Sequence, residues 1–152
     1  MSWEKWLADG RLARHRTSLD ELAGLRSAIA RNLSDAALNG LSADNRFGLA
    51  YEAALLAAKM AVAAAGYRVK SVPGAHRVTF EAMARAMGPS VQPQADYLEL
   101  ARRKRNDLSY DSAGIVTAKE ADEILREAAR LNDAVERWLV ARRKRRTHSK
   151  RP

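Results

Sequence analysis

The segment between Ser42 and Gly66 constrains the fold more than any other, because its apolar face is built mostly from alanine. Ser42 and Asp44 are favourable residues at a helix start, and Gly66 is a favourable residue just after a helix end. Small side chains allow a neighbouring helix to approach closely. We therefore predict that this helix is the central one of a bundle. Its buried face is expected to contain Phe47, Ala50, Tyr51, Ala54, Ala58, Ala61 and Ala65.

A first long helix is expected ahead of this segment. Ser18 and Glu21 stand three residues apart and form a capping box, in which each residue can satisfy a backbone N–H at the helix start. Apolar residues then recur at helical spacing. The helix is expected to end near Leu38, because Asn39-Gly40 follows and this pair is typical of helix ends.

A loop and two further helices are expected after the alanine-rich helix. Pro73 and Gly74 indicate a loop over residues 67–75, and a short helix is expected between that loop and Gly88. Pro93 suits the first turn of a fourth helix, since proline lacks the N–H that a first-turn residue leaves unpaired.

The last helix has the most regular apolar pattern of the chain. Thr117 and Glu120 form a second capping box at its start, and the helix is expected to fray in the basic residues after Ala141. Aromatic residues make up only 6% of the chain and alanine dominates the apolar set, which favours helix over sheet. We predict an all-α, up-and-down bundle of four to five helices.

The chain of 152 residues is expected to form one domain with an extension at each end. Residues 1–17 form an amphipathic segment in which Trp3 and Trp6 are expected to pack onto the core or onto a partner subunit. Residues 18–140 form the bundle. Residues 141–152 form a basic tail.

Charge is concentrated in that tail. The net charge of the chain is +9, and seven Lys or Arg residues but no acid follow Ala141. Such a run attracts polyanions without sequence preference, although a solvated tail that aids solubility would have the same composition. The polyanion-binding residues of the tail are predicted to be Arg142, Arg143, Lys144, Arg145 and Arg146.

Several classes of site are absent from the sequence. The three histidines are scattered singly, and there is no cysteine, so neither a metal site nor a disulfide framework is expected. No glycine-rich phosphate loop, dinucleotide-binding turn or nucleophilic triad is present, and no cofactor is expected. The lack of cysteine favours a reducing cytoplasm. No apolar run reaches the roughly 20 residues of a membrane span, so no membrane partner is expected.

Residues 102–111 are the one cluster that resembles a site. Arg105, Asn106 and Asp111 lie with Tyr110 in a short run that offers a guanidinium, an amide, a carboxylate and a hydroxyl. The basic residues would also suit an ordinary helix C-terminus. Arg102 and Asp111 from this run are expected to contribute to substrate binding, together with His76 and Arg77 at the start of the third helix. Backbone N–H groups at the start of the third helix could donate hydrogen bonds to an anion.

The chain resembles the HEPN family, the nucleotide-binding helical domains of higher eukaryotes and prokaryotes, over residues 18–140. The resemblance rests on Arg105-Asn106 followed by three residues and Tyr110, with Tyr110 at the usual histidine position of the motif. Residues 44–53 and 66–68, and the run 73–77 that opens the third helix, carry the rest of it.

The resemblance implies a homodimer in which two motif helices face each other across a cleft that binds RNA. It implies metal-independent endoribonuclease activity of toxin-antitoxin or defence type. In that activity Arg105 would stabilise the charge on the phosphorane, Asn106 would orient Arg105 or the phosphate, and Tyr110 would be the third catalytic residue. A phenol is a poor general base at pH 7, although it can donate to the phosphate or to the leaving oxygen. The implied partners are RNA or a nucleotide, and a cognate antitoxin or nucleotidyltransferase-like protein.

Two alternatives remain open at this point. Tyr110 in the histidine position favours a non-catalytic module that binds nucleic acid or protein. A protein that neutralises another protein could use the Trp3 and Trp6 pair and the tail as attachment points.

Overall fold

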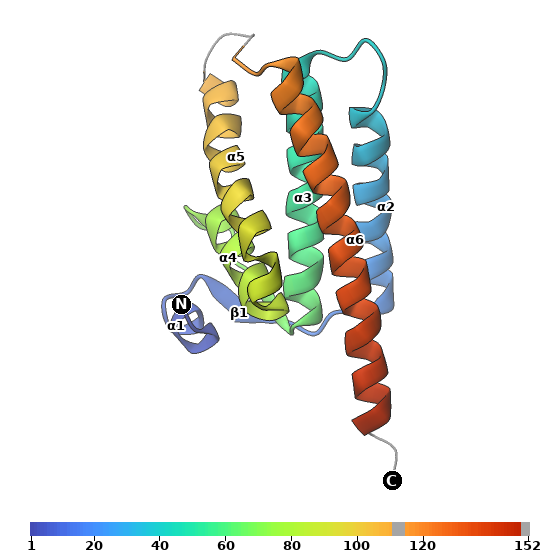
Figure 1. Cartoon of the computed structure of the whole chain (residues 1–152). Helices are drawn as coiled ribbons and strands as arrows, with labels where there is room; N and C mark the ends of the chain where they lie inside the picture. Colours follow the sequence, from blue (N-terminus) through green and yellow to red (C-terminus); the bar gives the residue numbers. More distant parts are fainter. Residues whose placement is uncertain (111–114, 150–152) are drawn as a thin grey trace.

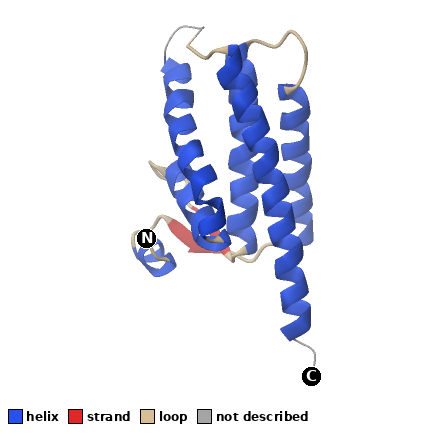
Figure 2. Ribbon diagram, viewed as in Figure 1, coloured by secondary structure: helices blue, strands red, loops and turns tan. Residues whose placement is uncertain are grey.

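The computed structural model describes the backbone of residues 1–110 and 115–149, and the side chains of these residues except 109, 110, 148 and 149. The described part is an all-helical bundle with one small pair of strands, which confirms the predicted fold class (Figures 1 and 2). Its elements are α1 (Trp3–Ala8), β1 (Leu12–Arg14), α2 (Leu19–Ala36), α3 (Ala43–Ala64), β2 (Tyr67–Val69), α4 (Ala75–Met87), the 3-10 turn η1 (Pro89–Val91), α5 (Gln92–Tyr110) and α6 (Ala118–Ser149).

Helix α3 is the centre of the bundle, as its alanine-rich face predicts. It packs against α2, α4, α5 and α6, and Figure 1 shows it enclosed by these helices. Ala50, Ala54, Ala58 and Ala61 are completely buried, so the neighbouring helices meet the α3 backbone closely. Tyr51 is also completely buried, which confirms its prediction as a core residue.

Helix α3 is also the one helix of the described part that is long and apolar enough to cross a membrane. However, 67% of its most apolar window is buried inside the bundle. Burial by other helices is the usual state of a core helix in a soluble protein. Burial in the bundle core therefore accounts for the apolar character of α3.

The helix starts follow the capping signals. The side chains of Ser18 and Ser42 accept hydrogen bonds from the backbone N–H groups of Glu21 and Asn45, each at 3.1 Å. At the start of α6, Thr117 and Glu120 exchange two hydrogen bonds of 3.0 Å in a complete capping box.

The strand pair was not predicted from the sequence. Leu12, Ala13 and Arg14 pair antiparallel with Val69, Arg68 and Tyr67, so part of the loop expected over residues 67–75 is a strand. Tertiary contact explains the difference, because Leu12 is buried and the backbone N–H of Lys70 continues the pairing by bonding to the Arg11 carbonyl at 2.9 Å. The pairing fixes where the chain enters α4.

The N-terminal segment packs onto the bundle through its tryptophans. Trp6 is buried, and the rings of Trp3 and Tyr67 stack with centroids 4.3 Å apart. The two tryptophans therefore pack onto this chain, which agrees with their prediction as packing residues.

Helix α6 differs from expectation at its end. It continues to Ser149 and does not fray after Ala141. Arginine and lysine are good helix formers, and the guanidinium carbon of Arg142 lies 5.4 Å from the ring centroid of Trp138 one turn earlier. Most of the expected tail is thus part of a helix with defined faces.

Candidate functional site

A hollow of about 470 Å³ lies where the start of α4 meets α5 and the loop after β2. Its walls carry four Lys or Arg side chains and one histidine, and no acidic residue lines it. The polar residues that matter here are Lys59, Lys70, His76, Arg77, Arg102 and Asn106.

The start of α4 forms one wall of the hollow. Gly74 precedes the helix with a φ of 85°, a left-handed conformation that glycine adopts without strain, and no side chain caps the helix. The hydroxyl of buried Thr79 donates to the Ala75 carbonyl at 2.8 Å and fixes the first turn from inside. A helix start presents backbone N–H groups and a partial positive charge, which adds to the attraction of this hollow for anions.

Tyr51 and His76 form the buried link of the site. The Tyr51 hydroxyl and His76 Nδ1 are hydrogen-bonded at 2.9 Å, which joins the central helix to the start of α4. Burial raises the pKa of Tyr51, while the charge of Arg105 opposes this rise. The phenol therefore stays protonated at neutral pH, and it can act as donor or acceptor toward the imidazole.

His76 is held mainly in its neutral form. Burial lowers its pKa, the positive charges of Arg105 and Lys59 lower it further, and Glu52 works against them. A neutral imidazole can accept a proton at pH 7. Because Nδ1 is engaged by Tyr51, Nε2 is the nitrogen that remains for a ligand.

Arg105 contacts the same tyrosine from α5. Its guanidinium carbon lies 5.6 Å from the centroid of the Tyr51 ring, a cation–π arrangement. Arg105 does not line the hollow itself, and its influence on His76 is electrostatic.

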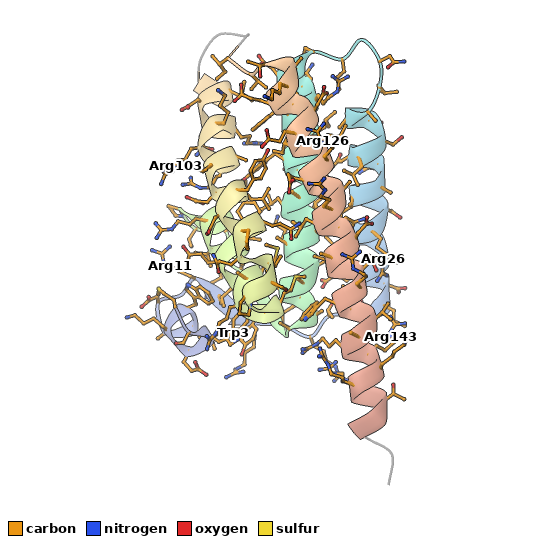
Figure 3. The ribbon with its side chains drawn as sticks, in the orientation of Figure 1. Trp3, Arg11, Arg26, Arg103, Arg126 and Arg143 are labelled. Atoms are coloured by element: carbon orange, nitrogen blue, oxygen red, sulfur yellow. The ribbon has the colours of Figure 1, made fainter. Side chains whose placement is uncertain are left out.

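Acidic neighbours offset only part of the positive charge. Arg102 forms a two-pronged ion pair with Glu99, at 2.7 and 3.0 Å, and the Arg102 hydrogen bond lowers the pKa of Glu99. Arg77 pairs with Glu81 at 2.9 Å. Within the described residues, no ion pair of this kind offsets Lys59 or Lys70. Figure 3 shows Arg11 and Arg103 projecting from the same side of the molecule.

The structure brings together four of the predicted site residues. His76 and Arg77 from α4 face Arg102 and Asn106 from α5 across one hollow. Arg105 joins them through Tyr51. The side chain of Tyr110 and the whole of Asp111 lie outside the described residues.

Sequence reasoning missed three residues of the site. Lys59 and Lys70 line the hollow, and the Tyr51 hydroxyl holds His76. A usable signal existed for Lys59, since it is the only charged residue between Ala53 and Ala65. No sequence signal pairs Tyr51 with His76, because that contact depends on how α3 and α4 pack.

No group of three or more potential metal-binding side chains occurs in the part of the chain that the structure describes. Comparison with protein-family models, with curated proteins and with solved structures found no match.

Proposed function

We propose that this protein binds RNA or a nucleotide, and that the hollow between α4 and α5 holds a phosphate group. The observation that carries this proposal is the lining of the hollow, which combines four cations and a largely neutral histidine with no acid. Phosphate is the anion that this arrangement suits best, because arginine forks, lysine ammonium groups and a helix start can share its oxygens.

The dimensions of the hollow support a ligand larger than a lone ion. Its volume of about 470 Å³ falls within the range of about 300 to 1,000 Å³ that small-molecule sites occupy. Asn106 offers both an amide donor and an acceptor on the α5 side, which a purely electrostatic anion site would not need. A ribose or base beside the phosphate would use these groups.

The resemblance to HEPN proteins points to the same class of ligand. In this chain the histidine comes from α4, whereas the family motif carries it on the helix of the arginine. His76 can take the role that the family assigns to its motif histidine, since it faces Arg102 and Asn106 across the hollow.

A second candidate function is metal-independent cleavage of RNA, and the position of His76 beside Arg102 and Asn106, with its Nδ1 bonded to Tyr51, favours it. In that reaction His76 Nε2 takes the proton of a ribose 2′-hydroxyl, whose oxygen then attacks the adjacent phosphorus. The bond from phosphorus to the 5′-oxygen breaks as that oxygen receives a proton from an acid. The products are a 2′,3′-cyclic phosphate and a 5′-hydroxyl, and Arg102 would stabilise the phosphorane charge.

Binding without cleavage is the better-supported form of the proposal. Cleavage needs a base and an acid at once, and His76 is the one imidazole among the side chains that line the described hollow. Tyr51 stays protonated and is occupied by His76. The acid would have to be Tyr110 or a group of a second protomer.

Incubation of the purified protein with a mixed RNA in EDTA separates the two functions. Cleavage by the parent that His76→Gln and Arg102→Ala abolish, with new cyclic phosphate ends, would establish the ribonuclease. Tyr110→Phe then tests the phenol as the acid. RNA binding with no cleavage, or with cleavage shared by all variants, would leave the binding function.

Homodimerisation remains part of the proposal. Leu100 on α5 is 64% exposed, which is a large exposed fraction for a leucine, and it offers a second copy a contact on the face of α5 opposite the one that lines the hollow. Sedimentation equilibrium tests this point, because Leu100→Glu should yield monomers if α5 forms the interface. A cognate antitoxin or nucleotidyltransferase-like partner is supported by the family resemblance alone.

A further inference from the structure

A second hollow, of about 250 Å³, lies between the start of α2 and the end of α6. Arg142, Arg143 and Arg146 line it from α6, while Ser18 and Arg26 line it from the α2 side. Figure 3 labels Arg26 and Arg143, which lie along this part of the two helices. The continuation of α6 beyond Ala141 creates the hollow, so it would not exist if the basic residues formed a loose tail.

Arg142 has a polar atom that the protein leaves unsatisfied. Its Nε is buried and has no hydrogen-bond partner within the described residues. A buried donor without a partner destabilises the folded chain, and a charged donor does so more than a neutral one. Its guanidinium also stacks on the Trp138 ring at 5.4 Å, which holds the group in one orientation.

The walls of this hollow are positively charged. No acidic residue lines it, although Arg26 on the α2 side pairs with Glu136. Burial lowers the pKa of Arg142, and the charges of Arg146 and Arg145 lower it further. Three guanidinium groups therefore line one hollow, beside the positive end of the α2 dipole.

We propose that this hollow is a second anion site, which binds a phosphate group through Arg142, Arg143 and Arg146. A phosphate would satisfy the buried Arg142 donor and contact the two other arginines that line the same hollow. The phosphate group can belong to a free phosphate or to an RNA strand. The site does not depend on the function proposed for the first hollow.

The helix makes this proposal distinguishable from general attraction of polyanions. Lys144 and Arg145 belong to the same basic run but do not line the hollow, and both are exposed. A nonspecific basic segment would use all five cations alike. A built site must depend on the three lining arginines and not on the other two.

The test uses the full-length protein labelled with 5-fluorotryptophan. Trp138 stacks with Arg142, so its fluorine NMR signal reports on this hollow, and Trp138→Phe identifies the signal. One arm titrates inorganic pyrophosphate, and the other titrates a short single-stranded RNA. Arg143→Gln and Arg146→Gln are compared with Arg145→Gln, which removes the same charge from the same helix.

The Trp138 signal should shift with at least one ligand, and the responding arm identifies the source of the phosphate. Arg143→Gln and Arg146→Gln should weaken the affinity by about tenfold, whereas Arg145→Gln should change it by less than about twofold. Equal losses in all three variants, or no Trp138 shift with either ligand, would overturn the proposal. Circular dichroism melts verify that each variant is folded. A response of Trp138 without RNA binding at the first hollow would support this site while rejecting the proposed function.

Discussion

Tyr51 connects the core of the bundle to the candidate site. Its ring extends from α3 into the bundle core and contacts the Arg105 guanidinium, and its hydroxyl is hydrogen-bonded to Nδ1 of His76. The residue thus fixes which nitrogen of His76 is free and keeps the ring from turning. A tyrosine buried for packing can in this way position a proton carrier that belongs to another helix.

The Tyr51→Phe substitution tests this contact. It keeps the ring but removes the hydroxyl, so the free energy of unfolding should fall by about 1 kcal/mol and His76 should lose its fixed orientation. The matched control is Tyr97→Phe, because Tyr97 is half-buried on α5 and its hydroxyl makes no hydrogen bond within the described residues. Urea unfolding of both variants measures the difference. Equal and small losses would contradict the assigned contact.

The lowered pKa of His76 predicts how stability depends on pH. Above the unfolded pKa of about 6.5, His76 is neutral in both states and its contribution is complete. As the pH falls below that value, the unfolded chain takes up the proton first, so the free energy of unfolding decreases until the folded pKa is passed. Urea unfolding between pH 7.5 and 5 should show this loss in the parent. The His76→Gln variant should lack it, and parallel curves would refute the assignment.

At the scale of elements, the β1–β2 pair and α4 place the site. The pairing fixes the chain as far as Lys70, and the left-handed Gly74 turns it into α4. The helices could be predicted because capping residues and apolar spacing are local signals, as at Ser18 and Thr117. The strand pair could not, because three-residue strands depend on a partner more than fifty residues away.

Two glycine substitutions test the role of the turn before α4. Gly74→Ala should lower the free energy of unfolding by about 1 kcal/mol or more, because the φ of 85° is strained for alanine. Gly24→Ala lies inside α2 with open space around it and should raise that free energy by about 0.5 to 1 kcal/mol. Thermal or urea unfolding shows whether each substitution lowers or raises the free energy of unfolding. Stabilisation by Gly74→Ala would show that the turn does not need glycine.

At the scale of the whole molecule, lysine and arginine side chains line two separate hollows. The helix assignment, the central place of α3 and four site residues followed from the sequence, since His76, Arg77, Arg102 and Asn106 were all named from it. The contribution of Lys59 and the second hollow depend on packing between helices distant in sequence. Such packing leaves no local pattern.

Removal of the residues after Ala141 tests the basic end as a whole. The truncated protein keeps Leu139 in the core and should remain folded, but it lacks all seven cations of that end. Affinity for single-stranded RNA should fall. The slope of log affinity against log salt concentration should become less steep by about 0.7 for each phosphate that these cations neutralise in the parent. Filter binding at several salt concentrations measures this slope. A truncated protein with the parental slope would exclude a role for this end in RNA binding.

The most direct test of the central claim is an NMR titration of the His76 ring nitrogens with a short single-stranded RNA in EDTA. The chain has only three histidines, so His76→Gln assigns the signals. A phosphate in the hollow stabilises the protonated imidazole, so RNA should shift the His76 signals and raise its pKa. Lys59→Gln should weaken this response, while Lys119→Gln, an exposed lysine outside the hollow, should leave it unchanged. A His76 ring that ignores RNA, or a response equal in both lysine variants, would contradict phosphate binding at this site.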